Sequence, residues 1–144
     1  MGSYTHSLDP KKRLTIPSEW RENVGTPNSL YVLPGLGLAN RRYLSVFPAS
    51  KMAERLKKIS SLSVADTKGR QFARLLGSQS QLAPWDSAGR IRISDSLLGY
   101  GNLLDQVELV GVIDHFELWN ADEWKQVGAM GISELRESAL NIQF

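Results

Sequence analysis

The segment that decides the fold is LDPKKRLTIP (residues 8–17), and it returns 77 residues later as WDSAGRIRIS (residues 85–94). In both copies an Asp stands four residues before an Arg, and an alternating run of apolar residues typical of a β-strand follows. A motif that occurs twice indicates a folded unit duplicated within one chain. We therefore expect the function to depend on what two Asp-x-x-x-Arg loops do together.

Outward from the motifs, the sequence predicts the same order of strands and helices in each half. In the first half we expect strands at residues 4–8, 14–16, 30–33 and 43–47, a helical turn after Pro17, and helices from Pro48 to about 59 and from Ala65 to Leu76, with Gly77 as the stop. In the second half we expect strands at residues 79–82, 91–93, 107–112 and 116–119, a helical turn at 95–98 closed by residues 99–101, and a helix capped by Asn120. Turns are predicted at 25–29 and 34–37. The expected class is therefore α+β.

The duplication predicts a division of the chain into two halves and a tail. The halves are expected at residues 1–77 and 78–128, either as one domain or as two interlocked units that share a core. Residues 128–131 are rich in glycine and are expected to form a flexible joint. The tail, residues 129–144, has no counterpart in the first half, so we expect a small extra helix or a mobile segment.

The charge is distributed unevenly between the two parts of the chain. The net charge is only +2, but residues 1–72 carry +7 and residues 73–144 carry −5. A basic half is expected to meet a polyanion such as DNA, or to attract the acidic half of a second chain. Solvated surface charge is the alternative interpretation.

Among these interpretations, the residue types in the loops favour binding to a polyanion such as DNA. The Asp carboxylate is expected to accept hydrogen bonds from backbone N–H groups or to pair with the Arg four positions on, which would fix the direction of the guanidinium. Arginine reads guanine in the major groove, and neighbouring lysines suit phosphate contacts. The alternative is an internal ion pair that stabilises the turn and nothing else.

Other classes of function find little support in the sequence. With no cysteines, disulfides and thiolate metal sites are excluded. His6 and His115 are the only histidines, and a small hydrolase built on His115 and Asp114 is the weakest of the hypotheses that we keep. The tryptophans are expected to be anchors in the core or at an interface. We find no membrane-length apolar stretch and no secretory signal, so a cytoplasmic protein is expected.

Taken in order, five segments resemble the MraZ family, bacterial transcriptional regulators of the division and cell wall gene cluster. They are the first motif, RQFARLLG (70–77) between the motifs, the second motif, VGV (110–112) and FELW (116–119), and the resemblance covers about residues 4–127. It implies an α+β fold of two tandem, pseudo-symmetric, AbrB-like swapped-hairpin β-barrel halves with short helices. It also implies a homo-oligomeric ring, associated with the nucleoid, that binds double-stranded DNA at repeated promoter boxes. No cofactor, metal or small-molecule substrate is expected.

Carried onto this sequence, the DNA-binding motif of the family falls on both loops. The residues implied are Asp9, Lys11, Lys12, Arg13, Asp86 and Arg90. Lys12 stands where the family usually has a small residue, often Gly, so a positive φ at that position would strain Lys12 and change the shape of the loop. Ser94 replaces the Pro that usually closes the second motif. Because its half is acidic, the second loop is the weaker candidate for DNA. A ring-forming interaction protein without specific DNA binding is the alternative function.

Overall fold

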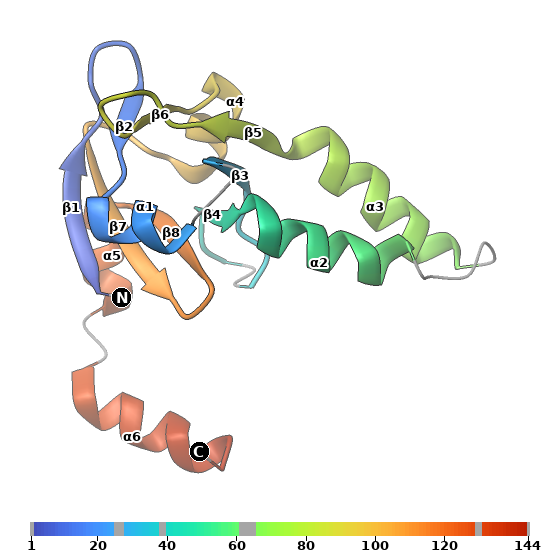
Figure 1. The fold of residues 1–144 in the computed structure, drawn as a ribbon. Helices are drawn as coiled ribbons and strands as arrows, with labels where there is room; N and C mark the ends of the chain where they lie inside the picture. Colours follow the sequence, from blue (N-terminus) through green and yellow to red (C-terminus); the bar gives the residue numbers. More distant parts are fainter. Residues whose placement is uncertain (1, 25–27, 38–39, 61–65, 129–130, 144) are drawn as a thin grey trace.

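A computed structural model of the chain describes residues 2–24, 28–37, 40–60, 66–128 and 131–143. The strands are β1 (Ser3–Ser7), β2 (Arg13–Thr15), β3 (Ser29–Pro34), β4 (Tyr43–Pro48), β5 (Gln81–Pro84), β6 (Arg90–Arg92), β7 (Gln106–Val112) and β8 (His115–Asn120). The helices are α1 (Ser18–Val24), α2 (Ala49–Ser60), α3 (Thr67–Gln79), α4 (Asp95–Gly101), α5 (Ala121–Gly128) and α6 (Gly131–Asn141). The predicted α+β class is confirmed (Figure 1).

The strands of the two halves are interleaved. The large sheet has the order β1-β7-β8-β4-β3-β5, and β2 pairs with β6 in a separate two-stranded ribbon. Exchanging β1–β4 with β5–β8 turns this order into its own reverse, so the fold has an internal two-fold pseudo-symmetry. The pseudo-axis passes through the pairs Leu14–Ile91 in the ribbon and Ser45–Glu117 in the large sheet. A closed barrel is not among the pairings of the described strands.

One apolar core joins the two halves. Fully buried side chains of the ribbon (Leu14 and Ile91) pack with those of the large sheet, such as Val32, Val107 and Leu118, in a single cluster. Trp20 from α1 closes this cluster and contacts the Phe116 ring at a centroid distance of 4.8 Å. Strand pairing and core packing therefore both depend on residues from the two halves.

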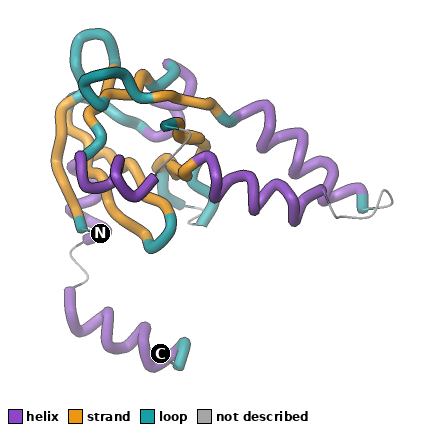
Figure 2. Tube along the Cα trace, viewed as in Figure 1, coloured by secondary structure: helices purple, strands orange, loops and turns teal. Residues whose placement is uncertain are grey.

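The opposite face of the large sheet carries aromatic pairs and a smaller core. Tyr43 stacks on Trp119 at 4.6 Å between ring centroids, and Phe47 stacks on His115 at 4.3 Å. Met52 of α2 packs with Leu33 and Phe47 in a second buried cluster on this face. Helices α2 and α3 project side by side from the sheet, whereas α6 lies apart from it (Figure 2).

Two helix ends differ from the predictions. Helix α3 passes through Gly77 and ends at Gln79, because Ser80 adopts an extended backbone and donates its N–H to the Leu76 carbonyl. Helix α4 continues beyond Leu98 to Gly101 and ends where Asn102 adopts a left-handed conformation with φ of 52°. The predicted Asn120 cap is confirmed, since its Oδ1 accepts the N–H groups of Asp122 and Glu123.

The predicted extra helix of the tail is α6, and it presents Ile132, Leu135 and Leu140 to solvent. Three predictions fall partly or wholly outside the described residues: the turn at 25–29, the start of the third helix at Ala65 and the joint at 128–131.

Candidate nucleic-acid interface

The two predicted loops lie at opposite ends of the β2–β6 ribbon. Each loop leads directly into one of the two strands, and the antiparallel register pairs Arg13 with Arg92 and Thr15 with Arg90. Each loop also touches the strand that follows the other loop. Ile93 donates its N–H to the Lys12 carbonyl at 3.2 Å, and Ile16 donates to the Gly89 carbonyl at 2.9 Å. The ribbon and both loops thus form one unit.

In the first loop, the Asp9 carboxylate organises the backbone and holds Arg13. Its Oδ1 accepts the N–H groups of Lys11 at 2.9 Å and Arg13 at 2.8 Å, and its Oδ2 accepts Nε–H of Arg13 at 2.6 Å. Only the Nε–H of Arg13 bonds to Asp9, so the end-on edge of the guanidinium, which carries the two terminal nitrogens, is left for another partner. Neither terminal nitrogen has a hydrogen-bond partner within the ranges that the structure describes.

The second loop repeats this arrangement bond for bond. Asp86 accepts the N–H groups of Ala88 at 2.9 Å and Arg90 at 3.0 Å, and its Oδ2 accepts Nε–H of Arg90 at 2.9 Å. The Asp–Arg pairing predicted from the repeat is therefore present in both loops. The shape of the first loop is unchanged by Lys12, contrary to the expectation from the sequence.

These hydrogen bonds lower the pKa of both loop carboxylates. The Arg13 backbone N–H bond is the largest cause for Asp9, opposed by partial desolvation and reinforced by the Arg13 side chain. The Arg90 backbone N–H bond acts in the same way on Asp86. Both carboxylates therefore stay charged, and keep their loops closed, to lower pH than an unpaired Asp.

We expect the hydrogen bonds within both loops to persist at mildly acidic pH. Since the folded pKa lies below the ordinary value of 3.8, the stabilisation from each carboxylate is complete above that pH and is lost as the pH falls through the folded pKa. NMR titration of the Asp9 and Asp86 side-chain carbonyl carbons should give midpoints below 3.8. A midpoint at or above 3.8 for either residue would mean that its loop bonds do not persist in solution.

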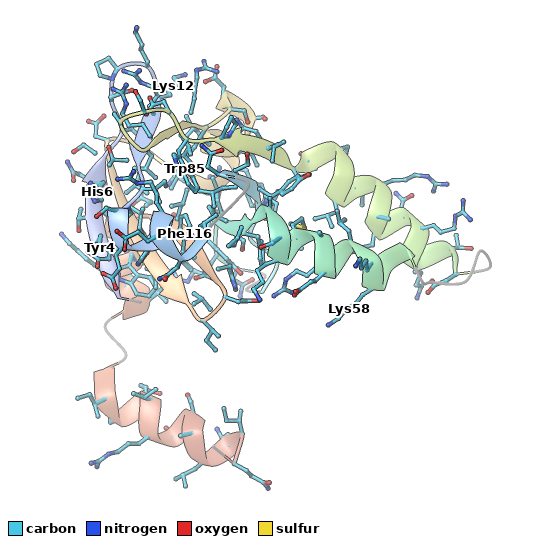
Figure 3. The ribbon with its side chains drawn as sticks, in the orientation of Figure 1. Tyr4, His6, Lys12, Lys58, Trp85 and Phe116 are labelled. Carbon is cyan, nitrogen blue, oxygen red and sulfur yellow. The ribbon has the colours of Figure 1, made fainter. Side chains whose placement is uncertain are left out.

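The corresponding position of the two loops has a left-handed backbone. Lys12 has φ of 61° and Gly89 has φ of 77°. This conformation is unfavourable for a residue with a Cβ, and glycine adopts it freely. Lys12 extends to the other half of the chain, where its Nζ lies 2.6 Å from Oδ1 of Asp95. A basic side chain thus stands at this position of the loop despite backbone strain (Figure 3 labels Lys12).

Replacing Lys12 with glycine measures the cost of the left-handed backbone conformation at this position. Relief of the left-handed strain should raise the free energy of unfolding by about 0.5–1 kcal/mol, net of the exposed ion pair with Asp95. Urea denaturation measures this gain, and Lys11→Gly in the same loop is the control, without gain. If Lys12→Gly lowers stability, the Lys12–Asp95 pair outweighs the strain.

The outer face of the ribbon carries three arginines. Leu14 and Ile91 are fully buried beneath it, so the alternation of the strands turns Arg13, Arg90 and Arg92 outward. Sequence analysis missed Arg92, although its position two residues after Arg90 places it on the same face. It also missed Asp95, the partner of Lys12, because that contact joins the two halves.

The histidines stay apart from this site. His6 lies on β1, paired with Val107 of β7. His115 lies on the aromatic face of the large sheet, and its Nδ1 is 2.9 Å from Oδ1 of Asp114. Within the described ranges, no three His, Asp or Glu side chains gather as a metal site would require. No described helix has the length and apolar character to cross a bilayer.

The fold and the site together define a class: an α+β protein with a two-stranded ribbon and two loops, in each of which an Asp side chain binds an arginine. Comparison with known proteins identifies the family to which this class corresponds. The family model described as "MraZ protein, putative antitoxin-like" matches residues 78–139, which extends beyond Gly128 into the tail, where the sequence resemblance was expected to end. The chain belongs to the MraZ family.

Relatives named "Transcriptional regulator MraZ" match over most of both chains. The protein of Corynebacterium jeikeium is 34% identical over 128 residues, 89% of this chain and 85% of the relative. That of Spiroplasma kunkelii is 36% identical over 87% of this chain and 84% of its own. That of Desulforamulus reducens is 31% identical over 99% and 96%. These matches confirm the resemblance drawn from the motifs.

Proposed function

We propose that this protein is a sequence-specific DNA-binding transcriptional regulator. The observation that carries the proposal is the outward row of arginines on a two-stranded ribbon, with Arg13 held by Asp9. The names of the relatives support the general role, since they are transcriptional regulators. The major groove of DNA admits a two-stranded β-ribbon, which makes the ribbon a suitable reading element.

Arg13 is the residue that we assign to base recognition. Its Nε is engaged by Asp9, so the terminal nitrogens remain for a paired contact to O6 and N7 of guanine. Arg90 is the equivalent residue of the second loop, in the acidic half. Asp9 and Asp86 orient the two guanidinium groups without touching DNA.

Lys11, Lys12 and Arg92 are assigned to phosphates. Lysine acts on phosphate as a point charge and contributes to affinity on every sequence alike. Arg92 pairs in register with Arg13, so both can reach the same stretch of duplex. Three such charges beside the reading arginine would fix the position of the ribbon on DNA.

Substitution of Lys11 tests the phosphate assignment. Its side chain is exposed and the loop uses only its backbone N–H, so Lys11→Ala leaves the loop bonds intact. We expect weaker binding on all sequences and a plot of log K against log salt that is shallower by about 0.9 for each engaged subunit. Fluorescence anisotropy at several salt concentrations measures this, and an unchanged slope would remove Lys11 from the interface.

Several chains are needed for useful affinity. We propose a homo-oligomeric ring, associated with the nucleoid, that engages repeated promoter boxes with one loop face from each subunit. Linking the loops raises affinity by a factor on the order of 10²–10⁴ through effective concentration. Within each subunit we propose residues 1–77 as the half with the principal DNA loop, residues 78–128 as its repeat and residues 129–144 as a separate tail.

A mobility-shift titration with DNA from upstream of the gene tests the proposal. The expected result is a complex that survives excess unrelated DNA, together with a mass by light scattering of several chains. A ring that binds neither the upstream DNA nor the unrelated DNA would instead support the alternative, an assembly protein without specific DNA binding.

A further inference from the structure

The second loop contains no lysine, but an arginine from the other half of the chain lies against it. Residues 86–90 read DSAGR, whereas the first loop has two lysines beside Arg13. A Cβ placed on Gly89 would lie 2.5 Å from Cζ and 2.6 Å from Nε of Arg21, which belongs to α1. The Arg21 guanidinium therefore occupies the space into which a side chain at Gly89 would project.

Two hydrogen bonds through Ile16 hold Arg21 beside the loop. Nε–H of Arg21 donates to the Ile16 carbonyl at 3.1 Å, and the Ile16 N–H donates to the Gly89 carbonyl at 2.9 Å. Ile16 is fully buried, so a fixed piece of backbone binds both the guanidinium and the loop. Arg21 itself is half-buried, and its two terminal nitrogens have no hydrogen-bond or carboxylate partner among the described residues.

The pseudo-symmetry shows that the two loops receive a cation at the same position from different elements. Arg21 corresponds to Leu98 of α4, because each donates its backbone N–H to the carbonyl four residues earlier. Lys12 and Gly89 correspond as well and share the left-handed backbone. In the first loop the cation stands on the loop and the helix residue is apolar. In the second loop the glycine leaves room and the helix supplies the cation.

The charge of Arg21 is less neutralised than that of Lys12. Nζ of Lys12 lies 2.6 Å from Oδ1 of Asp95, but the residue that corresponds to Asp95 beside the second loop is Ser18. A hydroxyl carries no charge to oppose the guanidinium. The two terminal nitrogens of an arginine also match two oxygens of one phosphate group. Arg21 is therefore suited to a phosphate at a loop whose own half of the chain is acidic.

We infer that Arg21 is a phosphate-binding residue of the second loop, where it flanks the base contact of Arg90. The inference rests on the proposed DNA-binding function and deepens it, because it assigns a contact that lies outside the Asp-x-x-x-Arg motif. It also gives Gly89 a second role besides its left-handed φ, since any side chain there would displace the guanidinium.

Fluorescence anisotropy on the full chain tests the inference, with the duplex from upstream of the gene and one of scrambled order, each at several salt concentrations. Arg21→Gln keeps a donor for the Ile16 carbonyl and removes the charge. It should weaken binding to both duplexes by the same factor and make the plot of log K against log salt shallower by about 0.9 for each engaged subunit. Arg21→Lys keeps the charge and should keep the slope. Arg136→Gln, which removes the same charge from α6, should change neither affinity nor slope.

The results distinguish this inference from the proposed function. If the unmodified protein prefers the upstream duplex and Arg21→Gln keeps the salt slope, the inference is overturned and the proposed function stands. A loss confined to the upstream duplex would also overturn it, since Arg21 would then read a base. If the unmodified protein binds both duplexes equally, the proposed function fails, but a shallower slope for Arg21→Gln would still support the phosphate contact.

A measurement on the unmodified protein covers the case in which the variants do not fold. The Nε–Hε NMR signal of Arg21 should shift when either duplex is added at low salt and should return when the salt concentration is raised. An unchanged signal at saturation with DNA would overturn the inference.

Discussion

We expect the replacement of Arg13 with alanine to abolish the proposed recognition of promoter boxes while leaving the protein folded. Each paired arginine–guanine contact is worth about 1–3 kcal/mol of discrimination, and the proposed ring would lose one such contact per engaged subunit. Residual binding should resemble binding to unrelated DNA and fall steeply with salt. The fold should survive because Arg13 is a surface residue over the fully buried Leu14.

Two further arginine variants show whether the loss of DNA recognition is specific to Arg13. Arg136→Ala removes the same charge from the exposed face of α6 and should bind promoter DNA like the unmodified protein. Arg90→Ala measures the share of the second loop, which we expect to be smaller. If Arg13→Ala shifts promoter DNA at the original affinity, the assignment of Arg13 to base recognition is wrong.

Replacing Ile91 with alanine will destabilise the whole molecule in a single transition. Ile91 is fully buried and sits on the pseudo-axis opposite Leu14, so truncation leaves a cavity where the two halves meet. The expected loss is about 2–5 kcal/mol in the free energy of unfolding. Urea unfolding followed by tryptophan fluorescence and by circular dichroism should give coincident curves.

The control for this variant is Ile132→Ala, since Ile132 is 72% exposed on α6 and its truncation should change stability by less than about 0.5 kcal/mol. Two separate transitions for Ile91→Ala would show that the halves unfold independently. That result would contradict the shared core.

Local patterns predicted most of the elements, and the repeat predicted that they come in two sets. The alternation after Arg13 and Arg90 located β2 and β6 to within a residue or two. The sequence does not show that β1 pairs with β7 and β3 with β5, because those partners lie far apart in the chain. The end of α3 was missed because an extended Ser80 stops the helix, and Gly77 does not.

The loops were more predictable than their surroundings. An Asp and an Arg four positions apart in a tight turn have few other partners, so their pairing followed from spacing alone. The Lys12–Asp95 pair and the register of Arg92 with Arg13 depend on how two distant strands meet.

The most direct test of the central claim compares two DNA duplexes at one salt concentration. One carries the sequence upstream of the gene, and the other carries the same bases in scrambled order. If the ribbon reads sequence, the upstream duplex should bind at least roughly 10³-fold more tightly, the lower end of the range for specific regulators. Equal affinities for the two duplexes would contradict the claim that Arg13 and its repeats recognise a DNA sequence.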